Sequence, residues 1–431
     1  MTKSTVIWTF AWMAAVSVLA LGGCSDDDAN ISTDPFKEVV QPDSALDEST
    51  VIVNGPYLHA PAEGTVTVNW ETVEPSSSRV ELTPEGGTPK VVTGIVYRQL
   101  PTTENPLLVG TPLQTYQHEV ILTGLEPGAR YGYRVLSSAN QPGAQLVGPP
   151  AVGDGMTFLV FGDTRTNHDD HAHVVDGMLT QMDVSDHPAF VLNTGDFTNT
   201  GGNEGDWATF FATEHPLISE VPLLAVFGNH EALLGRTAFE AYFQPPPTST
   251  STSDQYYSAD IGNVHLVVIE VGGALGDEPH DQWVEDDLAA STAPFKVAAL
   301  HAPFYTNSNH APQMSARELF GPIFEAQGVQ VVFSGHNHCY ERFVGYGSYF
   351  FTTGGGGAPL YGVDDNPTVD NGDTVREAAL SAFNFLWVTT SDTEMTIEAF
   401  VSRDATTPVT ESFDCVKVMA GEPVASSIPC N

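Results

Sequence analysis

Residues 157–165 have the sequence Thr-Phe-Leu-Val-Phe-Gly-Asp-Thr-Arg, and they indicate the fold class of the larger part of this chain. The first five residues form a continuous apolar run, which is typical of a strand buried on both faces of a sheet. The glycine that follows permits a tight turn, and Asp163 and Arg165 come after it. The stretch therefore predicts a buried strand with charged side chains at its carboxyl end.

The same arrangement recurs along the chain. Apolar strands precede the blocks Gly195-Asp196, Gly228-Asn229-His230-Glu231, His301-Ala302-Pro303 and Gly335-His336-Asn337-His338. Apolar residues recur at helical spacing between strands, for example from Val174 to Met182. Residues 154–401 are therefore predicted to form an α/β layer fold. Because the carboxyl ends of strands in such a sheet open onto one edge, we expect the blocks to meet there.

The residue types in these blocks favour a metal site. Two buried carboxylates, such as Asp163 and Asp196, cannot both stay ionised at close range without cations. Oxygen ligands combined with imidazole suit Mn, Fe or Zn, whereas sites built from oxygen alone suit Mg or Ca. The candidate ligands are Asp163, Asp196, Asn229, His301, His336 and His338.

Residues 51–150 show a different pattern. The segment 65–70 alternates with period two, and residues 116–122 form another expected strand. The run from Leu125 to Val135, which contains Tyr131, resembles the end of a fibronectin type III domain. We therefore predict a small all-β sandwich with a structural or spacing role.

The chain begins like an export signal. Lys3 is followed by an apolar run to Leu21 and then by Gly-Gly-Cys24. A cysteine in this position resembles the lipobox of bacterial lipoproteins, in which the cysteine carries lipid and becomes the first mature residue. The alternative is an uncleaved membrane anchor, because the run approaches the ~20 residues needed to span a bilayer. We expect residues 1–23 to be a signal peptide and the protein to be exported and lipid-anchored to the cell envelope.

Two segments flank the predicted domains and are expected to lie outside them. Residues 24–50 are acidic and poor in apolar side chains, which predicts a disordered tether. Residues 402–431 are expected to be a C-terminal tail, in which Cys415 and Cys430 are close enough to pair in an oxidising compartment. Cys339 is expected to be buried and free.

The charge balance excludes one class of partner. The chain has 15 Lys+Arg against 54 Asp+Glu, a formal net charge of -39. Such a surface repels phosphate backbones, which excludes nucleic-acid binding by a basic face. An anionic substrate must therefore be held by local cations in the site.

The ordered blocks resemble those of the calcineurin-like metallophosphoesterases. The run from His301 to Tyr305 and the fibronectin-like front domain are similar to those of the purple acid phosphatase branch. The resemblance covers about residues 50–401. It implies a metallophosphoesterase sandwich of two mixed sheets flanked by helices, preceded by an all-β domain. It also implies two transition-metal ions (Fe, Zn or Mn) and a phosphate ester substrate.

The resemblance also implies roles for the site residues. Asp196 would bridge both ions, with Asp163 and His338 on the first ion. Asn229, His301 and His336 would hold the second ion. His230 would lie beside the phosphate, and His310 would protonate the leaving alkoxide.

The sequence departs from the family around the first ion. Asn199 stands where the purple enzymes have an iron-binding tyrosine, and Arg165 stands where the wider family often has a second histidine ligand. Asn199, water, or one of His168, His171 and His173 is left to fill the gap. Arg165 is alternatively suited to hold a phosphate oxygen, because its fork of donors matches that geometry.

These features together predict a dinuclear-metal hydrolase of phosphate esters that acts mainly on monoesters. Two alternatives stay open, namely a phosphodiesterase and a catalytically weak surface-binding lipoprotein.

Overall fold

The computed structural model describes residues 37–100, 114–251, 256–271, 278–364, 375–404, 406–424 and 428–430. The predicted signal peptide and Cys24 lie outside these described residues. Among the described helices, none combines the length and the apolar character that crossing a membrane requires.

The N-terminal domain consists of strands in two sheets, together with the short 3-10 helix η1 (Ser44–Leu46). One sheet contains β1 (Lys37–Val39), β2 (Ile52–Ala62), β3 (Thr65–Thr72), β6 (Ile95–Gln99) and β7 (Tyr116–Thr123). The other contains β4 (Arg79–Pro84), β5 (Lys90–Thr93), β8 (Arg130–Val135) and β9 (Gly143–Val147). Trp70, Val68 and Leu82 are fully buried in the core of this domain. The Glu126 N–H donates to the Tyr131 hydroxyl at 2.8 Å and ties down the corner before β8.

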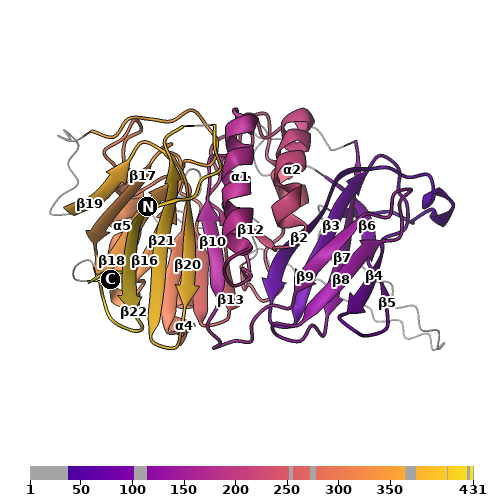
Figure 1. Cartoon of the computed structure of the whole chain (residues 1–431), viewed down its shortest axis with the longest axis horizontal. Coiled ribbons are helices and arrows are strands. Elements are labelled where there is room, and N and C mark those ends of the chain that lie inside the picture. The colour runs from indigo at the N-terminus through magenta and orange to yellow at the C-terminus, as the bar shows by residue number, and fades with distance from the viewer. Residues whose placement is uncertain are drawn as a thin grey trace, which may run out of the picture. The chain divides into compact units, whose positions relative to one another are not determined.

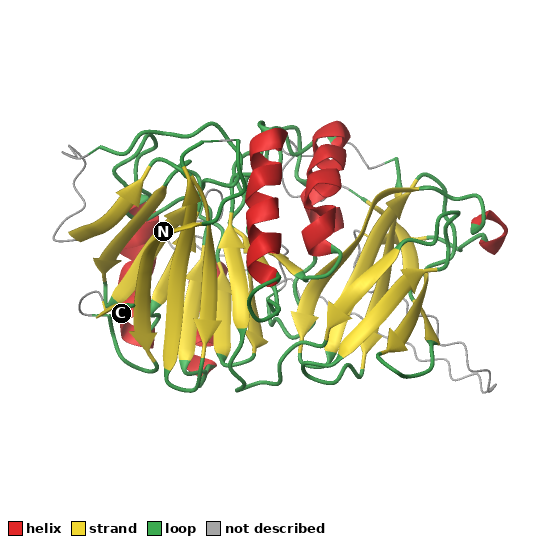
Figure 2. Ribbon diagram, viewed as in Figure 1, coloured by secondary structure: helices red, strands yellow, loops and turns green. Residues whose placement is uncertain are grey.

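The first sheet continues from the N-terminal domain into the second one. Its twelve strands follow the order β1-β6-β7-β3-β2-β12-β11-β10-β20-β21-β22-β23. The join is a parallel pairing that places Leu223 of β12 opposite His59 of β2. The His59 ring donates from Nδ1 to the Leu223 carbonyl at 2.8 Å and accepts from the Gln244 N–H at 2.7 Å. The two predicted domains therefore share one sheet (Figure 2).

The second domain places two mixed sheets face to face. Its part of the first sheet contains β10 (Thr157–Phe161), β11 (Val191–Asn193), β12 (Leu223–Ala225), β20 (Phe383–Thr390), β21 (Glu394–Ser402), β22 (Glu411–Met419) and β23 (Ile428–Pro429). The other sheet contains β13 (Tyr257–Ile261), β14 (Val264–Val268), β15 (Phe295–Ala299), β16 (Val331–Ser334), β17 (Tyr340–Gly345), β18 (Ser348–Thr353) and β19 (Val375–Leu380). Phe158, Leu386 and Phe333 belong to the buried cluster that joins the two sheets.

Helices cover the outer face of each sheet. The first sheet is covered by α1 (His168–Met182), α2 (Glu204–Ile218) and α3 (Thr237–Tyr242), as Figure 1 shows for α1 and α2. The other sheet is covered by α4 (Glu278–Ala290) and α5 (Met314–Gln327). The fold prediction is therefore confirmed: a metallophosphoesterase sandwich of mixed sheets flanked by helices follows an all-β domain.

Two segments differ from the sequence expectation. The described part of the predicted tether forms β1, which pairs with β6, and Lys37 forms an ion pair with Glu119 at 2.9 Å. The predicted C-terminal tail contains β22 and β23, and Val416 and Val418 of β22 enter the core between the sheets. Backbone pairing to β6 orders the first segment although it is short of apolar residues, whereas the buried valines of β22 anchor the second. A disulfide joins Cys415 to Cys430, and Cys339 is a buried free thiol.

Candidate metal centre

Three of the predicted ligands lie on unusual backbone at the carboxyl ends of strands. Asp163 follows β10, Asp196 follows β11 and His336 follows β16, with φ angles of 59°, 58° and 65°. Left-handed backbone at a non-glycine residue costs of order 1–3 kcal/mol and is concentrated at functional sites. The glycine before His336 is required by close packing, because a Cβ at Gly335 would clash with the Asp163 carboxylate. These turns aim the three side chains at one place.

Four of the predicted ligands form a compact group, which we call the His301 site: Asp196, Asn229, His301 and His336. His301 Nε2 lies 3.2 Å from Asp196 Oδ1 and 3.1 Å from Asn229 Oδ1. His336 Nδ1 lies 3.2 Å from the same nitrogen. Bonds of about 2.0–2.2 Å from a central ion place neighbouring ligand atoms about 3 Å apart. The His301 site therefore fits the first coordination shell of one metal ion.

Backbone carbonyl groups fix the histidine tautomers. His301 Nδ1 donates to the Thr194 carbonyl at 2.9 Å, and His338 Nδ1 donates to the Pro359 carbonyl at 2.7 Å. Each bond leaves Nε2 as the free ligand atom. Carbonyl partners of this kind orient the rings of metal-binding histidines.

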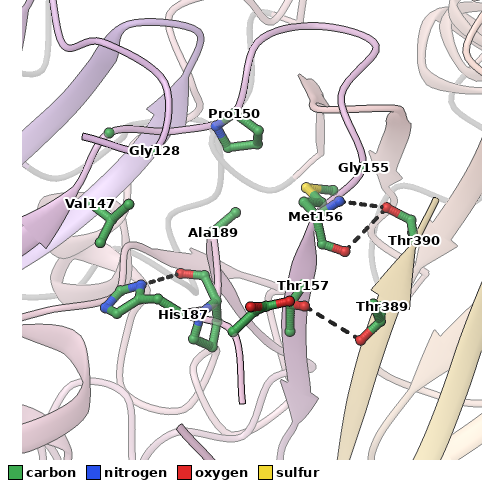
Figure 3. Close-up of a pocket in the computed structure, with 13 residues that line it drawn as sticks. Gly128, Val147, Pro150, Gly155, Met156, Thr157, His187, Ala189, Thr389 and Thr390 are labelled. Carbon is green, nitrogen blue, oxygen red and sulfur yellow. Dashed lines mark hydrogen bonds between the residues drawn. The ribbon is translucent and has the colours of Figure 1, made fainter. Parts of the chain in front are cut away.

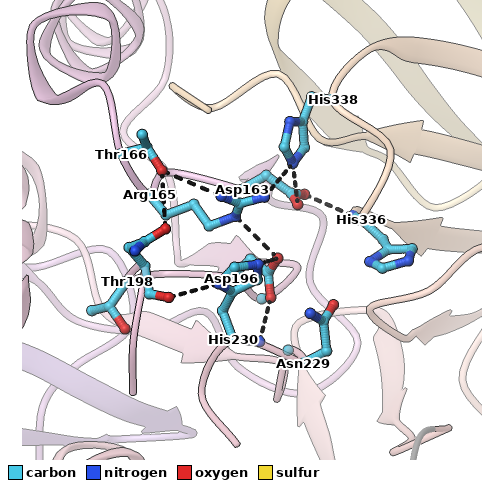
Figure 4. A network of polar contacts seen from close by, with 12 residues as sticks. Asp163, Arg165, Thr166, Asp196, Thr198, Asn229, His230, His336 and His338 are labelled. Carbon is cyan, nitrogen blue, oxygen red and sulfur yellow. Dashed lines mark hydrogen bonds and ion pairs between the residues drawn. The ribbon is translucent and has the colours of Figure 1, made fainter. Parts of the chain in front are cut away.

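The other side of Asp196, which we call the Arg165 side, contains Asp163, His338 and Arg165 (Figure 4). Asp163 Oδ1 lies 3.5 Å from His338 Nε2, and Asp163 Oδ2 accepts from the His336 N–H at 2.8 Å. The Arg165 guanidinium reaches between the other groups, with Nη2 3.3 Å from His338 Nε2 and Nε 3.4 Å from Asp196 Oδ2. Its side chain is 13% exposed. The atoms predicted to hold the first ion are therefore in contact with a guanidinium.

Burial shapes the charge states of the centre. It raises the pKa of Asp163 well above its usual range, although His301 opposes this shift. Burial alone would raise the pKa of Asp196 as well, but His301 outweighs it and leaves this pKa below its usual value. Burial lowers the pKa of His336 to about 3, so its ring is neutral and can act as a ligand. Burial alone would lower the pKa of His301, but Asp196 outweighs it and raises this pKa to about 10, so a cation that binds here would displace the His301 proton.

A fully buried carboxylate that the sequence analysis did not single out supports the centre. Glu231 Oε2 accepts from the N–H groups of Asp196 at 2.9 Å and Gly228 at 3.0 Å. Its Oε1 accepts from the N–H groups of Phe197 at 3.0 Å and Thr198 at 3.3 Å. Glu231 thus joins the loops after β11 and β12. Its position directly after His230 is the one feature of the sequence that could have indicated this role.

His230 lies beside Asp196. Its N–H donates to Asp196 Oδ1 at 3.0 Å, and its ring donates from Nδ1 to the Asn199 carbonyl at 2.7 Å. Nε2 lies 3.8 Å from Asp196 Oδ2, and the side chain is 20% exposed. The ring therefore offers one fixed nitrogen to a ligand at the centre.

His310 is brought to the centre by a supported loop. Its backbone N–H donates to Asn337 Oδ1 at 2.8 Å, and its ring lies 4.2 Å from the His336 ring, centroid to centroid. Glu341 anchors the same loop by accepting from the Asn307 N–H at 2.9 Å.

Tyr361, which the sequence analysis did not consider, stacks on the predicted ligand His338, and the two ring centroids lie 4.0 Å apart.

The residues suggested to complete the first ion lie elsewhere. His171 donates to the Gly356 carbonyl at 2.7 Å and lies 3.0 Å from Glu214, so it supports the glycine-rich loop. The Asn199 side chain accepts from the Thr166 hydroxyl at 3.5 Å. Within the described ranges, no hydrogen bond or ion pair joins Asn199, His168, His171 or His173 to the Asp163 or Asp196 side chains. The expectation that one of these side chains replaces the missing ligand is not supported.

A cavity of about 330 Å³ lies at the other end of the strands (Figure 3). Gly128 and Val147 line it on one side, and Met156, His187 and Thr390 line it on the other. The His187 ring donates to the Pro188 carbonyl at 3.0 Å, and the Met156 N–H donates to the Thr390 hydroxyl at 2.9 Å. This cavity lies at the start of β10, whereas the metal ligands follow the strand ends.

Comparison with known proteins agrees with this architecture. Residues 156–340 match the family model of the calcineurin-like phosphoesterases, and residues 55–147 match that of the purple acid phosphatase N-terminal domain. Purple acid phosphatase 22 of Arabidopsis thaliana is 32% identical over 52% of this chain and 53% of its own length. A purple acid phosphatase of Glycine max is 26% identical over 72% of each chain. The structure of purple acid phosphatase PPD1 from yellow lupin seeds superposes with a TM-score of 0.68, at 17% identity, over 84% of this chain and 74% of its own.

These matches place the second domain in the metallophosphoesterase fold class. The front domain corresponds to the purple acid phosphatase N-terminal domain, and its likeness to fibronectin type III stays a prediction. The chain spans about half the length of the first Arabidopsis relatives that it matches. The family implies a two-metal centre, whereas the structure offers one well-formed ligand group and a second that contains Arg165.

Proposed function

We propose that this chain is a metal-dependent hydrolase of phosphate esters and that phosphate monoesters are its main substrates. The observation that carries the proposal is the His301 site after β11, β12, β15 and β16, with His230 and His310 beside it. The similarity to purple acid phosphatases supports the same reaction class.

Asp196, Asn229, His301 and His336 would hold a metal ion, which would supply Lewis-acid chemistry and activate water for the attack. The chain's own residues bind and orient the substrate around that position. Arg165 donates to a phosphate oxygen from its guanidinium, because its Nη2 and Nε face the same space as His338 and Asp196. This contact replaces the long-range attraction that a surface with net charge -39 does not provide.

The two histidines beside the site donate to different parts of the substrate. His230 donates a hydrogen bond from Nε2 to a non-bridging phosphate oxygen in its doubly protonated form, in which Nδ1–H stays bonded to the Asn199 carbonyl. His310 donates a proton to the leaving alkoxide. The ring must be protonated for this step, and burial, with Arg165 adding to the effect, lowers the pKa of His310, so the step is favoured at acidic pH.

The substrate class is tested by comparing p-nitrophenyl phosphate with bis-p-nitrophenyl phosphate, with and without a chelator. We expect faster turnover of the monoester and loss of both activities on chelation. A reversed ratio would assign the protein as a phosphodiesterase. Activity that survives complete metal removal would contradict the metal-dependent reaction, and a protein inactive after reloading with Mn, Zn or Fe would be the catalytically weak binding lipoprotein.

We also propose that the protein is exported and lipid-anchored through Cys24. The apolar run that ends in Leu-Gly-Gly-Cys24 supports this, and so does the Cys415–Cys430 disulfide, because disulfides persist in oxidising compartments. Metabolic labelling with a radioactive fatty acid tests the anchor. Label should enter the wild-type chain and be absent from Cys24→Ala, whereas equal labelling of both chains would contradict the proposal.

A further inference from the structure

Arg165 occupies the space in which the family's first metal ion would stand. That ion requires Asp163, Asp196 and His338 as ligands, and the Arg165 guanidinium is in contact with two of the three. Its Nη2 lies 3.3 Å from His338 Nε2, and its Nε lies 3.4 Å from Asp196 Oδ2. The guanidinium therefore stands beside the lone pairs of His338 Nε2 and Asp196 Oδ2 that a metal ion would need, and as a cation with donors only it cannot be a ligand itself.

The sequence around Arg165 also indicates that the first metal position is altered. It lies two residues after Asp163, where the resemblance places a histidine ligand, and Asn199 replaces the tyrosine that is the other usual ligand. The Asn199 side chain points to the Thr166 hydroxyl, and His171 is held by Gly356 and Glu214. The first position has therefore lost two ligands and gained a fixed cation.

The remaining ligands are divided unequally between the two positions. In the His301 site, three ligand atoms lie 3.1–3.2 Å from His301 Nε2. Asp196, His301 and His336 also form the one cluster of metal-binding side chains found among the described residues. The Asp163–His338 pair is wider, at 3.5 Å, and shares its space with the guanidinium. Like charges in a largely buried site repel strongly, so a metal cation and Arg165 exclude each other here.

We propose that Arg165 replaces the first ion, so that this chain works with a single divalent ion in the His301 site. Arg165 then has two tasks: it balances the charge of Asp196, and its guanidinium donates to a phosphate oxygen. This inference rests on the proposed phosphoester hydrolysis and specifies the centre that performs it.

The experiment loads the metal-free full chain with Mn(II). Ions per chain are counted by native mass spectrometry, and the electron paramagnetic resonance spectrum is recorded. We expect one ion and the six-line spectrum of an isolated Mn(II). Two ions with a spin-coupled spectrum in a protein that hydrolyses phosphate esters would overturn the single-ion centre alone. A chain that binds no ion would overturn the proposed function as well.

Variants test whether Arg165 is the cause. Arg165→His restores a ligand at this position, and we expect the ion count to rise from one to two with a spin-coupled spectrum. Asp163→Asn should leave the wild-type count at one, but it should return the Arg165→His protein from two to one. Arg236→His is the matched control, because Arg236 pairs with Glu240 on α3, outside the centre, and its count should stay at one. An Arg165→His protein that folds and still binds one ion would contradict the role given to Arg165.

Discussion

The two sides of Asp196 have similar backbones and different chemistry. The turns at Asp163 on one side and His336 on the other share the same left-handed geometry after a buried strand. The His301 site combines one carboxylate, one amide and two imidazoles at ligand spacing. The Arg165 side keeps a carboxylate and an imidazole but adds a guanidinium. The fold therefore preserves the scaffold for two positions, while the side chains around each position differ in what they can hold.

The comparison also shows how the chain balances buried charge. Burial raises the pKa of Asp163, whereas for Asp196 the effect of burial is outweighed by His301 and His230, which leave its pKa below the usual value. Arg165 contributes a permanent positive charge that does not depend on metal supply. We infer that this arrangement gives up some Lewis acidity in exchange for a fixed phosphate-binding group.

The largest expected effect follows from disrupting the His301 site. His336→Ala removes one of four ligands, and we expect loss of the bound ion and a fall in kcat/KM of at least ~10³-fold. Metal content and p-nitrophenyl phosphate hydrolysis measure both effects. His187→Ala, which changes a histidine in the cavity at the opposite strand ends, should leave both unchanged. A His336→Ala protein that keeps its ion and its rate would show that the ligand group is assigned wrongly.

A smaller effect is expected for His310, which lies beside the ligands. His310→Ala should lower kcat by ~10²-fold for an alkyl phosphate, because an alkoxide leaves poorly without a proton. The loss should be slight for p-nitrophenyl phosphate, whose leaving group needs no proton. The two substrates are compared on the same preparation. Equal losses on both would indicate that His310 supports the loop near His336 and does not act as the acid.

A change behind the ligands should affect ion affinity. Glu231→Gln replaces an acceptor of four backbone N–H groups with an amide whose NH₂ group cannot accept. We expect the affinity of the His301 site for Mn(II) to fall by ~10-fold or more, as for other residues that support metal ligands. Titration calorimetry measures this affinity, and circular dichroism checks the fold. Unchanged affinity for Mn(II) in a folded variant would contradict the proposed role of Glu231 in positioning the ligands.

The smallest expected effect is a pH dependence of the stability of the fold, which arises from His265, a residue outside the metal centre. Burial alone would lower the pKa of His265, but hydrogen bonds to Asp260 and Asp287 outweigh it and raise this pKa to about 9. The stability contributed by protonated His265 is complete below about pH 6.5 and is lost as the pH rises through 9. His265→Gln should therefore destabilise the fold by roughly 1 kcal/mol more at pH 6 than at pH 10.

Urea unfolding at both pH values measures this difference. The ion count of His265→Gln should stay at the wild-type value. A variant whose destabilisation is equal at pH 6 and pH 10 would contradict the assigned ion pairs of His265.

Much of the fold follows from local sequence. The apolar runs predicted β10, β11, β12, β15 and β16, and the helical spacing predicted α1. Buried strands and amphipathic helices carry their signal in their own residues. The pairing of β2 with β12 was not predicted, because it joins residues His59 and Leu223, which are distant in sequence and have no distinctive local pattern.

The site was predictable in part for the same reason. The polar residues that follow a strand and a glycine could be expected to meet at one edge of the sheet. The direction of long side chains such as Arg165 could not be predicted in this way. Arg165 was interpreted as a phosphate-binding group, whereas its contacts with His338 and Asp196 depend on three separate loops. The roles of Glu231 and Tyr361 also depend on neighbours from other strands, which one sequence does not reveal.

The most direct test of the account is a titration of the metal-free full chain with Mn(II) while hydrolysis of p-nitrophenyl phosphate is followed. With a single ion in the His301 site, activity should rise linearly and level off at one ion per chain. A protein that stays inactive at any metal concentration would contradict the proposed hydrolase. Activity that appears only as a second ion binds would contradict the role of Arg165.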